Sequence, residues 1–382
     1  MFDEIFHKAL PLGFGLMRLP SLDPEDPGKI DIEQVKVMVD TFICQGFTYF
    51  DTAWMYCAFQ SENAVKEALT SRHSRDSFTL ATKLHAGFLQ TKEDRDRIFN
   101  EQKKKTGAEF FDYYLLHDIN AHSIDVYNEL DCFEWIRAKK EAGQIRHMGF
   151  SFHDSPELLD RVLTEHPEME FVQIQLNYLD YNNPGVQSRR CYEICVKHHK
   201  PVIVMEPVKG GTLVNLPKAA AEKFKALDPK LSPASYAIRF AASHENVKMV
   251  LSGMSTIAQL EDNTAYMKDF RPLDEQERKA VKEVVQILNS TIAIPCTGCS
   301  YCTDGCPEKI LIPKYFALYN AEMKQNPDNS LGWTPQKEYY DNLSRNYGRV
   351  SDCIGCRQCE RICPQHLPIL EYFKQVKERF EA

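Results

Sequence analysis

Short runs of β-branched, aliphatic and aromatic residues alternate with amphipathic segments up to about Arg271. In the amphipathic segments apolar residues recur three and four positions apart, as at Val35, Met38 and Phe42, which is the period of a helix with one buried face. This alternation is typical of strand–helix units in which helices cover a parallel sheet. The predicted strands are Leu12–Arg18, Phe47–Ala53, Phe78–Leu84, Asp112–His117, Arg146–Ser151, Phe171–Asn177, Pro201–Glu206 and Lys248–Gly253.

Eight strands that alternate with helices within fewer than 300 residues predict an α/β fold, the TIM (β/α)8 barrel. We expect the barrel to occupy residues 1–290, and a second, smaller domain to occupy residues 291–382. The predicted barrel helices are Asp31–Gln45, Ser61–Ser71, Asp125–Ala142, Ser155–Glu165 and Gln187–His199, with Asp274–Ser290 closing the domain.

The second domain carries the same cysteine spacing twice. In each copy four cysteines are separated by two, two and three residues, and a proline follows the fourth cysteine. We call each copy a cysteine ladder and the second domain the ladder domain. This spacing is typical of cubane [4Fe–4S] ligands, where the fourth cysteine of one copy binds the other cluster. We therefore expect one cluster on Cys296, Cys299, Cys302 and Cys363, and another on Cys353, Cys356, Cys359 and Cys306.

Two other interpretations of these cysteines are weaker. A zinc site takes about four ligands in paired modules and would leave the other ladder cysteines unused, while disulfides need an oxidising compartment. More than 40 residues separate the two copies, and this intervening stretch contains the helix-like segments 313–323 and 336–346. The second domain is therefore predicted to be a mainly α-helical ferredoxin-like module.

The overall composition restricts the class of partner. Hydrophobic residues make up 43% and charged residues 26% of the chain, which is enough to build a buried core. The formal net charge of −8 argues against a nucleic-acid partner, which needs a concentrated basic face. No apolar stretch approaches the roughly 18 residues of a membrane span. We expect a protein of the reducing cytoplasm.

Polar residues stand at or just after the ends of three consecutive predicted strands. Asp51 stands near the end of the second strand and Tyr56 follows that strand. Lys83 stands near the end of the third strand, and His117 ends the fourth. In a TIM barrel the carboxyl ends of the strands carry the chemistry. An ammonium beside a phenol is expected to lower the phenol pKa. Tyr56 could then donate a proton to a carbonyl oxygen while a hydride reaches the carbon.

These residues belong to motifs that resemble those of the aldo-keto reductases, in family order, from about Leu10 to Arg271. The resemblance implies that Tyr56 is the general acid, that Lys83 and Asp51 tune it, and that His117 orients the carbonyl. The whole arrangement is similar to ferredoxin-tailed aldo-keto reductases of anaerobic bacteria and archaea. The matching motifs are Gly13–Pro20, Asp51–Tyr56, Ala81–Lys83, Leu115–Asp118, Gly149–Ser151, Gln173–Asn177, and Ser252-Gly253 leading to Asn263.

The resemblance also implies a nicotinamide cofactor. Met205 stands where the family usually stacks an aromatic ring on the nicotinamide, and Gln259 takes the place of an arginine that would bind a 2′-phosphate. Without that charge-assisted contact, the choice between NADH and NADPH stays open. The expected cofactor-binding residues are Ser151, Gln173, Asn177, Met205, Ser252, Gly253, Ser255, Gln259 and Asn263.

The route of the electrons has three alternatives. A hydride carries two electrons whereas each cubane passes one, and a flavin normally joins the two kinds of transfer. Nicotinamide could reduce a carbonyl with structural or regulatory clusters, a flavin in the barrel mouth could feed the clusters, or the clusters could carry electrons from a ferredoxin or other redox partner to the substrate. A different class also remains: an electron-transfer or redox-sensing subunit whose barrel binds nucleotide without turnover. In the family the C-terminal segment folds over the mouth, so we expect the second domain to lie near the active site.

Overall fold

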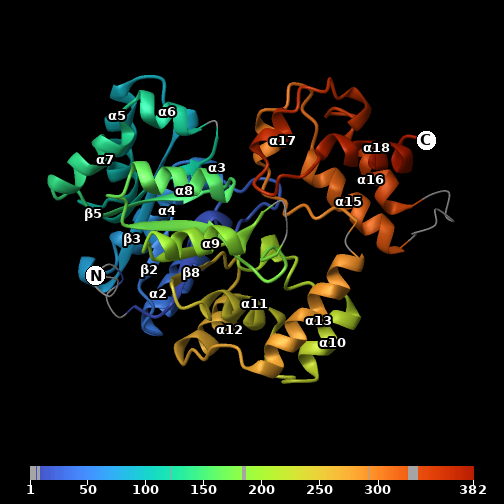
Figure 1. The fold of residues 1–382 in the computed structure, drawn as a ribbon, viewed down its shortest axis with the longest axis horizontal. Helices are drawn as coiled ribbons and strands as arrows, with labels where there is room; N and C mark the ends of the chain where they lie inside the picture. Colours follow the sequence, from blue (N-terminus) through green and yellow to red (C-terminus); the bar gives the residue numbers. More distant parts are fainter. Residues whose placement is uncertain (1–5, 7–8, 122, 183–185, 292, 326–333) are drawn as a thin grey trace.

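Eight parallel strands close into a barrel in sequence order, with β1 paired to both β2 and β8 (Figure 1). This closed barrel confirms the predicted TIM barrel. The computed structural model describes residues 6, 9–121, 123–182, 186–291, 293–325 and 334–382. The strands are β1 Leu12–Gly15, β2 Tyr49–Asp51, β3 Thr79–His85, β4 Phe111–Ile119, β5 Ile145–Phe152, β6 Phe171–Gln175, β7 Val202–Met205 and β8 Val247–Ser252.

Helices surround the strands, and each predicted barrel helix falls on a helical part of the structure. They begin with side-chain caps where the sequence supplies them, as at Asp31 and Ser155, because a capping oxygen satisfies a free amide of the first turn. The barrel helices are α2 Ile32–Cys44, α3 Tyr56–Phe59, α4 Ser61–Val65, α5 Lys92–Thr106, α6 Ser123–Glu129, α7 Cys132–Glu141, α8 Pro156–Glu165, α9 Ser188–Lys197, α10 Lys218–Lys225, α11 Pro233–Ala242, α12 Ile257–Lys268 and α13 Glu275–Thr291.

Two predicted elements differ in detail. The segment Leu16–Arg18, expected as the end of the first strand, is a single 3-10 turn, η1. The segment 125–142, expected as one helix, is divided between α6 and α7 because Asp131 adopts a left-handed conformation with φ 49°. Asparagine and aspartate tolerate that conformation better than most residues, and the break turns α7 back onto the barrel.

Aromatic rings form the packing between α2 and the first strands. Phe42 on α2 is fully buried. Its ring centroid lies 5.5 Å from that of Phe14, 5.0 Å from that of Phe47 and 5.4 Å from that of Phe50. Aromatic pairs at such distances contribute beyond the area that they bury, so this cluster fixes α2 against β1 and β2.

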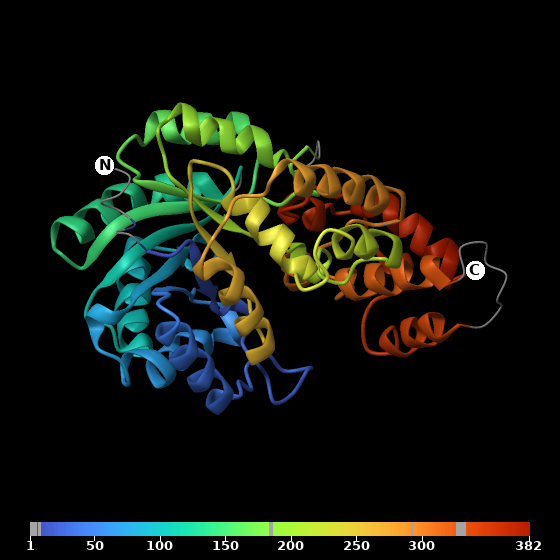
Figure 2. The same ribbon diagram turned by 90° about the horizontal axis from the view of Figure 1, so that it is seen from below.

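The second domain is mainly helical, as expected, and no strand occurs in the described part of it. It has a core of its own that includes Tyr315, Phe316, Tyr340 and Phe380. Figure 2 shows its helices beside the barrel rather than threaded through it. Its elements are α14 Tyr301–Asp304, α15 Ile312–Gln325, α16 Pro335–Leu343, η6 Val350–Asp352, α17 Gln358–Ile362 and α18 Ile369–Phe380.

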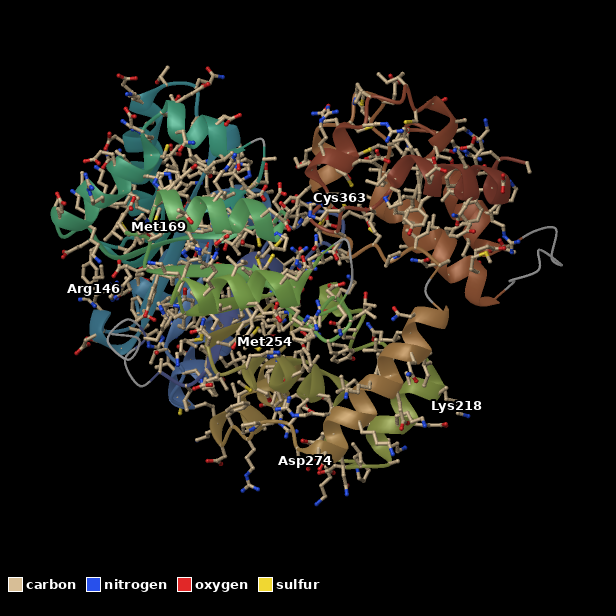
Figure 3. The ribbon with its side chains drawn as sticks, in the orientation of Figure 1. Arg146, Met169, Lys218, Met254, Asp274 and Cys363 are labelled. Carbon is tan, nitrogen blue, oxygen red and sulfur yellow. The ribbon has the colours of Figure 1, made fainter. Side chains whose placement is uncertain are left out.

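The second domain meets the barrel at the carboxyl ends of the strands. Gln365 Nε2 donates to Gln175 Oε1 at the end of β6, at 2.7 Å. Figure 3 shows Cys363 on the side of the second domain that faces the barrel. Among the helices that the structure describes, none is long and apolar enough to cross a membrane.

Replacing Phe42 by alanine is expected to destabilise the barrel by about 3–5 kcal/mol, because it removes a buried ring and leaves a cavity. Phe42→Leu keeps most of the volume and is expected to cost less than about 1.5 kcal/mol. Urea unfolding followed by far-ultraviolet circular dichroism measures both changes. Equal stabilities of the two variants would show that the aromatic cluster does not hold α2 in place.

Candidate active site

The barrel brings the three strand-end residues and Tyr56 together. The parallel register places Asp51 opposite Ala81, and side chains two residues apart share a face, so Lys83 lies on the same face as Asp51. Lys83 Nζ lies 2.5 Å from Asp51 Oδ1 and 3.4 Å from Tyr56 Oη. The ring centroid of His117 lies 5.9 Å from that of Tyr56. An ammonium, a carboxylate, a phenol and an imidazole therefore adjoin one another.

Burial dominates the electrostatics of the phenol. It raises the pKa of Tyr56 well above its usual value, and the carboxylates of Asp51 and Glu206 add to the effect. The expected lowering of this pKa by Lys83 is thus outweighed. Burial also lowers the pKa of Lys83, against the attraction of Asp51. The phenol is held in its protonated form, which is the form that can give a proton away.

The imidazoles around the mouth are neutral. Burial lowers the pKa of His117 well below its usual value, with His85 and Lys83 adding to the effect. Burial likewise lowers the pKa of His85 and of His153 to about 4. The Nδ1 atom of His117 has no hydrogen-bond partner within the described chain. A neutral ring with a free nitrogen can act as a hydrogen-bond partner for a ligand.

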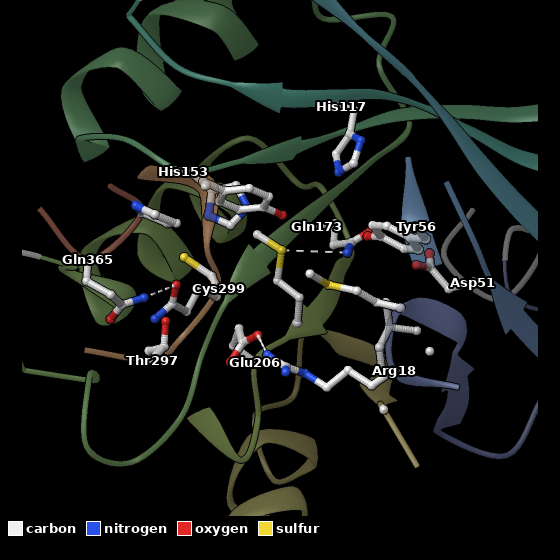
Figure 4. Close-up of a pocket in the computed structure, with 18 residues that line it drawn as sticks. Arg18, Asp51, Tyr56, His117, His153, Gln173, Glu206, Thr297, Cys299 and Gln365 are labelled. Atoms are coloured by element: carbon white, nitrogen blue, oxygen red, sulfur yellow. Dashed lines mark hydrogen bonds and ion pairs between the residues drawn. The ribbon is translucent and has the colours of Figure 1, made fainter. Parts of the chain in front are cut away.

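Tyr56 and His117 line a cavity of about 90 Å³ whose opposite wall comes from the second domain. Figure 4 shows Asp51 and Tyr56 on one side and Cys299, Thr297 and Gln365 on the other. The cavity lining consists of Gly15, Met17, Arg18, Asp51, Tyr56, His117, His153, Gln173, Gln175, Met205, Glu206, Leu251, Gly253, Thr297, Cys299, Tyr301, Pro364 and Gln365.

Many polar atoms of this cavity are buried and have no hydrogen-bond partner among the described residues. A buried polar atom without a hydrogen bond costs free energy, so such a concentration indicates that a polar ligand completes the site. The atoms are Arg18 Nη2, Asp51 Oδ2, His117 Nδ1, His153 Nδ1, Gln173 Oε1, Glu206 Oε2 and Thr297 Oγ1.

A larger cleft of about 510 Å³ adjoins this cavity and shares Arg18, Glu206, Leu251 and Gly253 with it. Its volume lies within the range of about 300–1,000 Å³ that small-molecule and cofactor sites occupy. Five of the nine residues expected to bind cofactor line the cleft: Ser252, Gly253, Ser255, Gln259 and Asn263.

The other four expected cofactor residues divide into two pairs. Gln173 and Met205 line the cavity, and Gln173 Nε2 lies 3.6 Å from Met205 Sδ. Ser151 and Asn177 are outside the lining of both spaces. Ser151 Oγ accepts from the backbone amide of Asp118 at 2.8 Å.

Asn177 is occupied by contacts within the protein. Its Nδ2 donates to Asp180 Oδ2 at 2.8 Å and to the Glu206 carbonyl at 3.0 Å. Its Oδ1 accepts from the backbone amides of Leu179 and Asp180. In this arrangement the side chain holds the loop after β6, and its contact with a cofactor stays a prediction.

Sequence reasoning missed several residues of the site. Glu206 directly follows β7 and His153 directly follows β5, so the strand-end rule could have found both. Thr297, Tyr301 and Gln365 carry no such signal, because they reach the cavity only through the docking of the second domain.

The eight ladder cysteines lie in two groups, and which cluster each group would hold stays a prediction. Cys306, Cys353, Cys356 and Cys359 line one pocket. In the other group burial raises the pKa of the Cys299 thiol to about 11, and Cys363 adds to the effect. We call the second group, Cys296, Cys299, Cys302 and Cys363, the first cradle, and the group with Cys306 the second cradle.

The cradles suit clusters better than single ions. No three His, Cys, Asp or Glu side chains in the described ranges converge as one metal ion would require. A cubane binds its four thiolates through separate iron atoms, so its ligands surround a volume instead of meeting at a point. The donor set therefore fits an iron–sulfur cluster.

Comparison with known proteins identifies both domains. Residues 11–286 match the model of the aldo/keto reductase family, and residues 295–367 match the 4Fe-4S dicluster domain. The chain belongs to the aldo/keto reductase family. It is an oxidoreductase of that family with an iron–sulfur domain joined to its C-terminal side, as the motifs predict.

Solved aldo-keto reductases share the barrel. One from Bacillus halodurans is 24% identical, with a TM-score of 0.56 over 72% of this chain and 91% of that one. Another, from Klebsiella pneumoniae in complex with NADP and acetate, is 17% identical, with a TM-score of 0.57 over 72% of this chain and 92% of that one. These likenesses establish the fold.

Curated relatives match shorter segments. One component of the ion-translocating oxidoreductase complex of Buchnera aphidicola subsp. Acyrthosiphon pisum is 29% identical over 82 residues, which is 22% of this chain. Norsolorinic acid reductase B of Dothistroma septosporum is 34% identical over 91 residues, or 24% of this chain. The chain spans only 14% and 23% of these two proteins' lengths.

The crossed cradles predict a specific pattern of iron loss. Cys306→Ser alone is expected to remove about half of the iron. Because Cys306 and Cys359 would hold the same cluster, Cys306→Ser with Cys359→Ser should remove no more than the single change. Cys306→Ser with Cys299→Ser should remove nearly all of it.

Colorimetric iron and sulfide assays on protein purified without oxygen measure these contents. Cys44→Ser, at an exposed thiol outside the ladders, is the matched control and should keep its iron. The reverse pattern in the two double variants would show that each ladder holds its own cluster.

The neutral buried imidazoles predict a loss of stability in acid. The pKa of His117 lies below its unfolded value of 6.5, so the unfolded chain binds more protons than the folded one below that pH. The part of the unfolding free energy that these neutral histidines contribute is therefore fully present above pH 6.5. It is lost as the pH falls from 6.5 toward about 4, the folded pKa of His85. Each histidine adds up to about 1.4 kcal/mol per pH unit.

Denaturant unfolding of the wild type, His117→Gln and His85→Gln over this pH range tests the effect. Each variant is expected to depend less steeply on pH than the wild type. An unchanged slope in both variants would mean that these imidazoles are already protonated in the folded protein.

Proposed function

We propose that the barrel reduces a carbonyl-type small molecule in the cavity between Tyr56 and the first cradle. The observation that carries this proposal is the position of the Tyr56 hydroxyl, which lies 3.4 Å from Lys83 Nζ in a cavity that adjoins a cofactor-sized cleft. A proton donor and a place for a hydride donor therefore share one mouth.

Each residue of the group has a proposed role in that reaction. The carbonyl oxygen would lie against the Tyr56 hydroxyl, with a ring nitrogen of neutral His117 beside it. The hydride bonds to the carbonyl carbon, and the Tyr56 proton bonds to the oxygen, which gives an alcohol. Lys83 stabilises the negative charge left on Tyr56, and Asp51 holds Lys83 in place at 2.5 Å.

The cleft would hold the nicotinamide nucleotide. Nicotinamide supplies a hydride when bound. Arg18 is the only cationic side chain among the described residues that line the cleft, and it lies at the end shared with the cavity. Gln259 and Asp262 line the part of the cleft near α12. A 2′-phosphate there would meet a carboxylate and no cation, which favours NADH.

We propose that the barrel domain comprises residues 1–290 and the ladder domain residues 291–382. The ladder domain would supply single electrons through two clusters. Its first cradle reaches the cavity at Cys299. Its second cradle reaches the surface, where Cys356 is exposed and Ile354 is 65% exposed. A ferredoxin or other redox protein would therefore meet the second cradle, and a flavin in the mouth stays a prediction.

The other candidate is an electron-transfer or redox-sensing subunit whose barrel binds nucleotide without turnover. The exposure of the second cradle favours a redox partner in either case. The two candidates differ in whether the Tyr56 hydroxyl is needed for reaction.

Tyr56→Phe is expected to lower the NADH-dependent reduction of small aldehydes and ketones by about 10²- to 10⁴-fold, because the proton donor is lost. The ring remains, so iron content and nucleotide affinity should stay unchanged. Initial rates measured without oxygen, with NADH and with NADPH, check the expectation.

Tyr178→Phe is the matched control, since its hydroxyl is also buried without a described partner but lies outside the lining of the cavity. It should keep full activity. Activity retained in Tyr56→Phe would show that Tyr56 is not the proton donor. Activity absent from the wild type with every carbonyl tried would favour the electron-transfer role.

A further inference from the structure

Lys209 is a buried ammonium at the junction of the two domains. It is 2% exposed and begins the single turn η5, Lys209–Gly211, after β7. Its φ of 49° lies in the left-handed region, which side chains other than glycine seldom adopt. Carbonyl reduction as proposed above makes no use of it. A buried charge in a strained conformation calls for a specific role.

Lys209 joins an ion pair whose two ends face different domains. Its Nζ lies 2.6 Å from Asp180 Oδ1 and 2.8 Å from Gln365 Oε1. The other carboxylate oxygen, Asp180 Oδ2, accepts from Gln175 Nε2 and Asn177 Nδ2, each at 2.8 Å. The positive end thus faces the ladder domain, while the negative end is held by amides of the barrel.

The first cradle lies directly beyond this positive end. Gln365 comes two residues after Cys363 in the chain. On the other side, Gly210 packs against the residue after Cys296 so closely that a Cβ on Gly210 would lie 2.3 Å from the Thr297 carbonyl oxygen. The turn that carries Lys209 therefore touches both ends of the first cradle.

The charge of Lys209 lies close to both ends of the first cradle. Lys209 and Cys296 line the same cleft, and Lys209 Nζ contacts Gln365, which follows Cys363 by two residues. A cation in this position favours any negative charge added to the cradle. Lys209 and Gln365 are both buried, so the interaction is screened less than it would be at the surface.

We propose that Lys209 tunes the first cradle electrostatically and raises the reduction potential of the cluster held there. Reduction adds one electron, and hence one negative charge, to a group that its thiolates already make negative. The nearby ammonium stabilises the reduced form more than the oxidised form. The inference rests on the proposed cluster in the first cradle and is independent of carbonyl reduction.

Substitutions at the two ends of the ion pair are expected to shift the reduction potential of the cluster in opposite directions. Lys209→Met removes the cation and leaves Asp180, so the cluster should become harder to reduce. Asp180→Asn leaves the cation without its counter-charge, so the cluster should become easier to reduce. A purely structural role for the ion pair would move both variants in the same direction.

A redox titration with dithionite, followed by electron paramagnetic resonance of the as-purified holoprotein, measures the effect. The signal of the first cluster is identified by its loss in Cys299→Ser. At a fixed potential the ratio of reduced to oxidised cluster is expected to change by about tenfold in each direction, which is about 59 mV for a one-electron couple.

Three controls separate charge from packing. Lys209→Arg keeps the charge and should keep the potential. Gln365→Leu removes the hydrogen bond between the domains but leaves the cation, so it should shift the potential much less than Lys209→Met. Lys309→Gln changes an exposed lysine three residues after Cys306 of the second cradle and should leave the first cluster unchanged.

The proposal is overturned if Lys209→Met and Asp180→Asn shift the potential in the same direction, or if neither shifts it. If Lys209→Met loses its iron, Asp180→Asn and Lys209→Arg decide the question, since a raised potential in the first and an unchanged one in the second support electrostatic tuning. Because no carbonyl substrate is used, the result is distinct from any failure of Tyr56→Phe.

Discussion

The burial of the barrel mouth beside the ladder domain is the constraint on which the rest of the site depends. Thr297, Cys299 and Tyr301 of the ladder domain form one wall of the cavity, and the hydrogen bond from Gln365 to Gln175 joins the two domains there. In this position burial, rather than any single neighbour, has the largest effect on the pKa of Tyr56 and of His117. The barrel and the ladder domain thus form one site, because the acid–base properties of the first require the cover of the second.

Much of the fold and half of the site could be predicted from the sequence because they follow from local periodicity. Strands with apolar runs must lie in the barrel, and parallel strands put their carboxyl ends at one mouth. Asp51, Lys83 and His117 could therefore be placed together without any knowledge of distances. The cysteine spacing was equally informative, since a cubane dictates which thiols it needs.

The rest depends on contacts that no local pattern carries. Tyr301 and Gln365 reach the cavity only because the two domains meet, and no residue near them in the sequence indicates that contact. The raised pKa of Tyr56 depends on the depth of burial, so reasoning from the nearest charge gave the wrong direction. The hydrogen bond from Asn177 to Asp180 could not be predicted either, because it depends on how the loop after β6 folds back on itself.

The crossed assignment that we propose would have a consequence for how the protein responds to air. Each cradle would take one thiol from the far ladder, so damage to one cluster would loosen both ladders at once. Cys299 is both a wall of the cavity and a member of the first cradle. Loss of a cluster held there to oxygen would therefore disturb the wall opposite Tyr56, and the state of the cluster and the shape of the cavity would change together.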